Sequence, residues 1–266
     1  MIILLTNDDG IRSPGLWAAA EELLKIAELW IVAPAKQCTS AGRSHSRETS
    51  GQITEVEAPE GIRAFSVDCM PAQCVHHAIL GIMPKKPDLI VSGINSGTNI
   101  GIDITRSGTV GAALEAANYG IPAMAVSLET DNSETFSEEP QADFRTAAYF
   151  CRFFAAAAAG ELGADVHILK IEVPAGAGHD TAWELTTLSK SPYYFIKKTQ
   201  SDCCGRHSGL SWYTQTDFSV FTEGTDAHCL LVRRRVALTP LSLDLTSRVP
   251  LDSLKSEIQK NLADIS

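Results

Sequence analysis

The sequence lacks the features that would assign it to nucleic-acid-binding or membrane proteins. It has no excess of basic residues, because 22 Lys and Arg face 32 Asp and Glu, and the net charge is −10. Such a chain has no basic field to attract phosphates, so no long nucleic acid is expected as a partner. No apolar run approaches the roughly 18 residues that a membrane span needs, so no membrane partner is expected.

The sequence also lacks a regular cysteine pattern and a targeting segment. Its seven cysteines are an odd number at irregular spacings, and Cys203 directly precedes Cys204 without a C-x-x-C motif. This pattern argues against a zinc ribbon or a disulfide framework and is typical of reduced thiols in the cytoplasm. The apolar start at residues 2–5 is too short for a signal peptide and has no basic leader. We therefore expect a cytoplasmic globular protein.

Strand and helix patterns alternate over residues 1–130. The apolar run MIILLT precedes SPGLWAAAEELLKI, in which Ser13 and Pro14 are typical of a helix start, and the apolar run LWIVAP follows. Strand, helix and strand in such a short stretch are typical of a parallel sheet. The alternation continues with helices expected at 70–83 and 107–120 and strands expected at 87–95 and 121–129. The sequence predicts an α/β fold with a Rossmann-like, mostly parallel sheet flanked by helices.

The pattern changes after about residue 130. An acidic loop at 130–140 precedes an expected helix at 141–160 and an apolar strand at 166–174. Shorter alternating stretches at 212–221 and 229–241 are typical of antiparallel strands or hairpins. The C-terminal segment predicts an amphipathic helix whose apolar stripe is Leu251, Leu254, Ile258 and Leu262.

Oxygen-bearing side chains follow the predicted strands of the core. Asp8 and Asp9 follow the first strand, a hydroxyl-rich loop follows the second, and Asn95 closes the strand at 87–95. In an open α/β sheet, ligands bind outside the carboxyl ends of the strands, so these groups are expected at one edge. Carboxylate, hydroxyl and amide oxygens without clustered thiolates or histidines favour a hard cation such as Mg²⁺ or Mn²⁺.

A fourth element predicts a phosphate site. Ser107, Gly108 and Thr109 lie at the expected start of the helix at 107–120, where free backbone N–H groups and the helix dipole attract anions. A carboxylate-bound cation beside such an anion site indicates phosphoester hydrolysis. The cation would polarise the phosphoryl oxygen and lower the pKa of a bound water.

Each of these signals has a simpler interpretation when it is taken alone. Asn-Asp-Asp-Gly is a common turn sequence, Asn95 could be a loop residue, and Ser107 could only cap a helix. His45 fits either a solvated loop or the rim of a site. His76 and His77, in an expected helix, fit surface or hydrogen-bonded core histidines better than ligands. The functional interpretation depends on oxygen ligands recurring at successive strand ends of one sheet.

Several long motifs in the chain resemble the SurE-type survival proteins, which are metal-dependent 5′/3′-nucleotidases. The opening ILLTNDDGIRSPG and the segment PDLIVSGINSGTNIG are the longest and most specific. The resemblance spans nearly the whole chain, with matching segments at residues 3–15, 32–34, 87–101, 107–116, 120–128 and 224–246.

The resemblance implies a phosphatase that acts on nucleoside monophosphates and carries one divalent metal ion, Mg²⁺ or Mn²⁺, in each subunit. The family's acidic pair falls on Asp8 and Asp9 and its asparagine ligand on Asn95. Its serine ligand falls on Thr39, with Ser40 as the alternative after a one-residue shift. In the resulting hypothesis Asn99 joins Ser107, Gly108 and Thr109 in holding phosphate, and Asp9 is either a second metal ligand or the base that orients water.

The resemblance also implies a homo-oligomer, a dimer or a tetramer, held by an extended hairpin and an exchanged C-terminal segment. We therefore expect a single domain over residues 1–266. Its Rossmann-like core would occupy 1–130 and 141–180. A hairpin and oligomerisation extension with a C-terminal helix would occupy about 181–266.

The chain departs from the family's pattern at three places. Ala35 and Lys36 replace an Asp-Arg pair, CMPAQCV at 69–75 replaces a GTPTDCV-like segment, and KIEVP at 170–174 replaces an NVNVP-like run. None of these changes removes an expected metal ligand, so activity is expected to be kept while substrate preference stays open. The alternative function is a nucleotide-binding stress regulator without turnover. A dinucleotide-dependent oxidoreductase is set aside, because the first turn lacks the G-x-G-x-x-G spacing.

Overall fold

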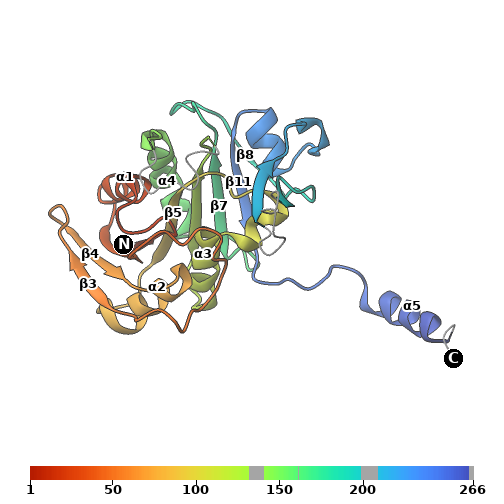
Figure 1. Cartoon of the computed structure of the whole chain (residues 1–266), viewed down its shortest axis with the longest axis horizontal. Coiled ribbons are helices and arrows are strands. Elements are labelled where there is room, and N and C mark those ends of the chain that lie inside the picture. The colour runs from red at the N-terminus through yellow and green to blue at the C-terminus, as the bar shows by residue number, and fades with distance from the viewer. Residues whose placement is uncertain (132–140, 161, 199–208, 264–266) are drawn as a thin grey trace, which may run out of the picture.

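A nine-stranded sheet forms the centre of the molecule in the computed structural model, which describes residues 1–131, 141–160, 162–198 and 209–263 (Figure 1). The strand order is β3-β4-β2-β1-β5-β6-β7-β11-β8, and all neighbours are parallel except the pairs β3–β4 and β7–β11. The strands are β1 (Ile2–Thr6), β2 (Glu28–Pro34), β3 (Ile53–Val56), β4 (Ile62–Val67), β5 (Leu89–Ser96), β6 (Ala123–Leu128), β7 (Ile168–Val173), β8 (Trp183–Leu185) and β11 (Val236–Leu241). The mostly parallel sheet predicted from the sequence is confirmed.

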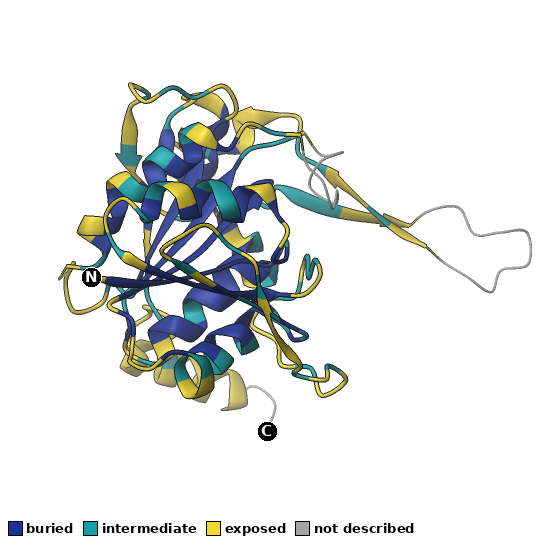
Figure 2. Cartoon of the chain, turned by 90° about the vertical axis from the view of Figure 1, so that its left-hand side faces the viewer, coloured by how far each residue is buried: buried dark blue, intermediate teal, exposed yellow. Residues whose placement is uncertain are grey.

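Helices cover both faces of this sheet (Figure 2). Leu5 of β1 packs into the core on the side of α1 and α4, and Leu4 packs on the side of α2 and α3. The helices are α1 (Pro14–Leu23), α2 (Pro71–His77), α3 (Gly108–Asn118), α4 (Arg145–Ala158) and α5 (Leu251–Ala263), with short helical turns at Ala78–Ile82, Gly101–Arg106, Phe218–Val220 and His228–Val232. Among the described residues, no helix is long and apolar enough to cross a bilayer.

The order of the strands reverses between β1 and β5. From β1 the chain first adds β2 on one side, and β5 to β7 then extend the sheet on the other side. Thr6 at the end of β1 pairs with Ser92 of β5, and β5 continues to Ser96, so the turn after β1 lies beside the last residues of β5. A crevice opens where strand order reverses in this way, and it is the usual ligand site of such sheets.

Two elements extend from this body. β9 (Tyr194–Lys198) and β10 (Leu210–Thr214) form a separate antiparallel hairpin, which projects outward in Figure 2. The C-terminal helix α5 lies away from the sheet at the end of an extended segment (Figure 1), and none of its residues is buried. The antiparallel hairpin and the terminal helix agree with the predicted fold class.

Some local expectations were wrong. The stretch at 229–241 was expected to be strand, but its first half forms the helical turn His228–Val232 and only Val236–Leu241 is a strand. Leu230 and Leu231 pack there against Ile100, so tertiary contact overrides the strand-like pattern. The stretch at 212–221 likewise ends its strand early, at Thr214. The expected helix at 70–83 divides into α2 and a wider turn at Ala78–Ile82.

Other expectations were incomplete or lie outside the described residues. β3 and β4 were not predicted, because their sequences, ITEV and IRAFSV, contain too many polar residues to form an apolar run. Residues 132–140 of the acidic loop lie outside the described part of the chain, as do Cys203 and Cys204. The five cysteines that are described have free thiols.

Candidate active site

The Asn-Asp-Asp-Gly sequence after β1 forms a turn that its first residue closes. Asn7 Oδ1 accepts a hydrogen bond from the Gly10 N–H at 3.1 Å, and Asn7 Nδ2 donates to the Gly10 carbonyl at 3.0 Å. Gly10 has a φ of +95°, which favours glycine. The turn interpretation of this sequence is therefore correct. It does not exclude the metal interpretation, because both carboxylates lie within the turn.

Asp8 lies at the carboxyl end of β1 and is almost completely buried. Its Oδ1 accepts a hydrogen bond from the Thr109 hydroxyl at 2.6 Å, which connects the end of β1 to the first turn of α3. Burial raises the pKa of Asp8, although the Thr109 side chain and backbone N–H groups, those of Gly108 and Thr109 among them, oppose the rise. The start of α3, expected to hold phosphate, thus also contacts a carboxylate.

Asp9 is held by the last residue of β5 and by the loop after β2. Its Oδ2 accepts a hydrogen bond from the Ser96 N–H at 3.0 Å, and its Oδ1 accepts from the Gln37 side chain at 3.4 Å. Burial and the neighbouring Asp8 raise the pKa of Asp9 to about 7. Asp8 is buried and Asp9 is partly buried. Two adjacent carboxylates so withdrawn from water are costly without a compensating positive charge, so this turn favours a cation.

Thr39 and Asn95 line one cavity together with Asp8. The Thr39 hydroxyl is buried and has no hydrogen-bond partner among the residues that the structure describes. Asn95 donates its Nδ2 to the Gly97 carbonyl at 2.7 Å, so its Oδ1 is the atom left for a ligand. Ser40 also lines the cavity but is exposed, with a φ of +62°. The loop is held against the turn because the Cys38 N–H donates to the Asp8 carbonyl at 2.7 Å.

The described residues at this edge fit a hard divalent cation. They supply carboxylate, amide and hydroxyl oxygens, and the unpartnered Thr39 hydroxyl is a buried polar atom that a cation would satisfy. Gly108 allows the close approach of α3, because a Cβ at that position would lie 2.7 Å from Asp8 Oδ2. The site is therefore built from the ends of β1 and β5, the loop after β2 and the start of α3.

The residues expected at the phosphate lie beside this cluster. Ser107 is the N-cap of α3, its Oγ accepting from the Val110 N–H at 3.0 Å, and it lines the cavity. Asn99 also lines the cavity and donates its Nδ2 to Ser127 at 3.0 Å. Gly108 and Thr109 are buried beneath the cavity, against Asp8.

The cavity has a volume of about 390 Å³, and its other walls were not predicted from the sequence. The hairpin contributes Tyr194, Trp212 and Tyr213. The short turn before α3 contributes Arg106, whose guanidinium lies 4.6 Å from the Trp212 ring centroid. No local sequence pattern predicts that the three hairpin residues line the cavity, because the hairpin is distant in sequence from the other walls.

A buried ionic cluster supports the loop that carries Asn99. Lys170 Nζ lies 3.1 Å from Asp226 Oδ2 and 3.4 Å from Glu172 Oε1, and all three side chains are buried. Glu172 Oε2 accepts from the Asn99 N–H at 2.9 Å. Burial raises the pKa of Glu172 to about 7, because two carboxylates share one ammonium and the attraction of Lys170 offsets only part of the cost. The segment KIEVP at 170–174, which stands in place of the family's NVNVP-like run, thus supplies Lys170 and Glu172 to a buried ion cluster.

Comparisons with known proteins agree with the sequence motifs. The family model described as "Survival protein SurE" matches residues 3–194. A protein named 5′-nucleotidase SurE from Thermococcus gammatolerans is 38% identical over 257 residues, covering 96% of this chain and 95% of the relative. A protein of the same name from Archaeoglobus fulgidus is 38% identical over 254 residues, covering 95% of each.

The fold of this chain is similar to that of a solved SurE structure. The crystal structure of the SurE protein from Aquifex aeolicus superposes with a TM-score of 0.76 at 30% sequence identity, covering 96% of this chain and 99% of that one. The match therefore includes the hairpin region as well as the core. Motifs, site geometry and these likenesses together show that the chain belongs to the SurE family.

Proposed function

We propose that this protein is a metal-dependent 5′-nucleotidase, which hydrolyses nucleoside monophosphates to nucleoside and inorganic phosphate. The observation that carries the proposal is the pair Asp8 and Asp9, one buried and one partly buried carboxylate at the point where strand order reverses, next to a cavity with an unpartnered hydroxyl among the described residues. The names of the SurE relatives support the same activity.

One divalent ion in each subunit, Mg²⁺ or Mn²⁺, fits the oxygen donors. Asp8, Asp9 and Asn95 would hold it, together with Thr39, whose buried hydroxyl is a better candidate than that of the exposed Ser40. When bound, such an ion polarises a phosphoryl oxygen and lowers the pKa of a coordinated water. The Gln37 and Ser96 hydrogen bonds would keep the Asp9 carboxylate oriented toward this centre.

The start of α3 and the Asn99 loop form the expected phosphate site. Ser107 and Asn99 reach the cavity, and Gly108 and Thr109 bring the positive end of the α3 dipole against it. The Asn99 side chain is held by Ser127 and its backbone by Glu172, so its position is fixed before substrate arrives. Such preorganised donors favour the charge that develops on phosphate oxygens.

The hairpin supplies an aromatic wall for the rest of the substrate. Tyr194 donates its hydroxyl hydrogen bond to the Thr98 carbonyl at 3.1 Å, which joins the hairpin to the loop after β5. Trp212 and Tyr213 add aromatic side chains to the same cavity. Aromatic side chains stack on nucleobases with little dependence on base identity, which favours a nucleoside over a simple phosphate ester.

The test is phosphate release from a panel of nucleoside monophosphates with Mg²⁺, with Mn²⁺ and with EDTA. We expect turnover that EDTA abolishes, and loss of turnover in Asp8→Asn and Asn95→Ala while the circular dichroism spectrum is unchanged. The control is Asp252→Asn, the same change at an exposed position on α5. Nucleotide binding without phosphate release would instead support the regulator, and wild-type turnover in Asp8→Asn would remove the assignment of that residue.

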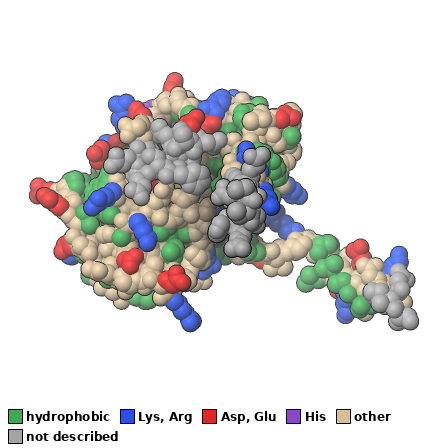
Figure 3. Space-filling model, viewed as in Figure 1, with side chains coloured by type: hydrophobic (Ala, Val, Ile, Leu, Met, Phe, Trp, Pro, Cys, Tyr) green, Lys and Arg blue, Asp and Glu red, His purple; other side chains and the backbone are tan. Residues whose placement is uncertain are grey.

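We also infer that the protein is a cytoplasmic homo-oligomer, a dimer or a tetramer, with one domain over residues 1–266. Leu251, Ile258 and Leu262 are exposed on α5, and hydrophobic side chains appear on this detached segment in Figure 3. Exposed apolar faces of this kind usually pack on another subunit. Light scattering after size exclusion should give a mass above one chain, and replacing these three residues by serine should lower it.

A further inference from the structure

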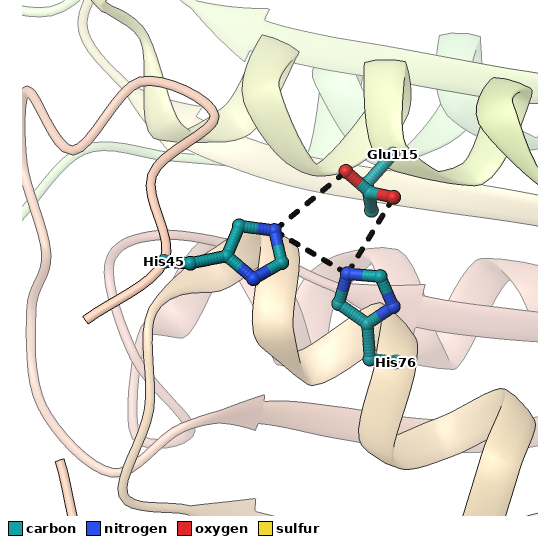
Figure 4. Close-up of side chains that lie close together, drawn as sticks. All are labelled: His45, His76 and Glu115. Carbon is teal, nitrogen blue, oxygen red and sulfur yellow. Dashed lines mark hydrogen bonds and ion pairs between the residues drawn. The ribbon is translucent and has the colours of Figure 1, made fainter. Parts of the chain in front are cut away.

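A second cluster of ligand-type side chains lies outside the proposed active site. His45 from the loop after β2, His76 from α2 and Glu115 from α3 point toward one another in Figure 4, and they are the metal-competent group of three found among the described residues. We propose that these three residues form a second metal site, selective for Zn²⁺-type ions, that ties the loop after β2 to α2 and α3.

The distances between the three side chains fit one small ion. His45 Nε2 lies 3.3 Å from His76 Nε2, His76 Nε2 lies 3.5 Å from Glu115 Oε1, and His45 Nε2 lies 3.9 Å from Glu115 Oε2. Tetrahedral zinc with bonds of about 2.0–2.1 Å separates its ligand atoms by about 3.3 Å. With one ligand atom taken from each residue, the three atoms lie within 4.8 Å of one another. The side chains would therefore move closer to contact one ion, and water would complete a four-coordinate shell.

Neighbouring residues already orient two of the ligands. His76 Nδ1 shares a hydrogen bond of 2.5 Å with the Tyr119 hydroxyl, and this leaves Nε2 facing the cluster. Such a bond to the other ring nitrogen is the usual support of a metal-bound histidine. Arg43 Nε donates to Glu115 Oε2 at 2.7 Å, so Arg43 holds the carboxylate while Oε1 remains next to His76.

The donor set selects the type of ion. Two imidazoles and one carboxylate are typical of zinc sites, whereas Mg²⁺ prefers a shell of oxygens. The two proposed sites therefore differ in chemistry, one with oxygen donors only and one with two nitrogens.

The location of the second metal site connects it to the proposed active site. Thr39 and Ser40 belong to the same loop as His45, and the Gly42 N–H donates to the Arg106 carbonyl at 2.9 Å. Glu115 follows Thr109 on α3 by six residues, about 9 Å along the helix. A metal ion at the second site would fix the loop that carries the proposed hydroxyl ligand against the helix that begins at the phosphate site.

The experiment is calorimetric titration of the full-length protein with Zn²⁺ in excess Mg²⁺, which occupies the oxygen site. We expect one Zn²⁺ per chain, and affinity that falls by about 100-fold or more in His45→Asn and His76→Gln, beyond the usual effect of an outer hydrogen bond. Tyr119→Phe should weaken binding by about tenfold. The matched control is His77→Gln, since the next histidine of α2 lies beside Gly51 and not in the cluster.

Two further measurements separate this site from the active site. Asp8→Asn should keep the Zn²⁺ affinity, and Co²⁺ should give the intense visible absorption of a tetrahedral site, which His45→Asn removes. His45 lies in an exposed loop, so that variant should fold normally. The proposal is overturned if the wild-type protein binds no Zn²⁺ in excess Mg²⁺, or if binding survives in His45→Asn and is lost in Asp8→Asn.

Discussion

The Thr109 hydroxyl donates a hydrogen bond to Asp8 Oδ1 at 2.6 Å, and both residues are buried. They are 101 positions apart in the chain, so the bond forms only when α3 packs over the end of β1. It orients the carboxylate that we propose as the first metal ligand. A variant that lacks this hydrogen bond but keeps Asp8 tests how much the orientation of the carboxylate contributes to metal binding.

Thr109→Val should weaken binding of Mn²⁺ by about tenfold, because the variant keeps the shape of the side chain but removes the bond that orients Asp8. The measurement is phosphatase activity against Mn²⁺ concentration, with calorimetry of Mn²⁺ binding. Thr105→Val is the control, since that threonine is exposed and its hydroxyl donates to the nearby Ile102 carbonyl and not to a proposed metal ligand. Equal Mn²⁺ affinities in the two variants would contradict the role of Thr109.

Gly108→Ala should lower both the stability and the activity of the protein. The added Cβ would lie 2.7 Å from Asp8 Oδ2 and from Asp8 Cβ, so α3 or the turn must move. We expect a loss of about 1–3 kcal/mol in the free energy of unfolding, measured by urea denaturation, together with weaker metal binding. Gly81→Ala is the control, because a Cβ there meets nothing within 4 Å. A fully active and stable Gly108→Ala protein would show that the close approach is not needed.

Trp212→Ala should raise KM for nucleoside monophosphates by about tenfold, because stacking on a base contributes about 1–3 kcal/mol. KM for ribose 5-phosphate, which has no base, should be nearly unchanged. Leu210→Ala, on the same strand but outside the cavity, is the matched variant. A similar rise in KM for both substrates would mean that Trp212 acts by shaping the hairpin and not by contacting the base.

The stability of the protein should fall as the pH rises toward neutrality, in part because of Glu172. Burial raises the pKa of this carboxyl from 4.5 to about 7, so the folded protein keeps a proton that the unfolded chain has lost. Its contribution to stability is fully present below pH 4.5 and is lost as the pH rises through about 7.

In Glu172→Gln the difference in the free energy of unfolding between pH 5 and pH 8 should therefore be smaller than in the wild type. Urea denaturation at the two pH values measures it, and Glu60→Gln at an exposed position is the control. The same pH dependence of stability in both variants would contradict a raised pKa of Glu172.

Much of the fold could be predicted because its signals are local. The apolar runs that became β1, β2, β5 and β6 are buried on both faces of a parallel sheet, and each is bounded by turn or cap residues. Asp8, Asp9 and Asn95 could be proposed together, because a parallel sheet brings the carboxyl ends of its strands to one edge whatever the details of packing.

Other features depended on contacts that no local pattern reveals. The stretch at 229–235 was expected to be strand, but Leu230 and Leu231 pack in the core as part of a helical turn. Lys170 and Glu172 look like polar interruptions of a strand, yet they meet Asp226 in a buried cluster.

The sequence by itself determined the alternation of strands and helices in the core, the oxygen-rich strand ends and the family, because periodicity and motif spacing lie within short stretches of chain. Only the tertiary structure decided that Thr39 rather than Ser40 has the buried hydroxyl, and that Trp212 faces the cavity. It alone brought His45, His76 and Glu115 together. Side chains from distant segments meet only where helices pack on the sheet, and the distances between them follow from that packing.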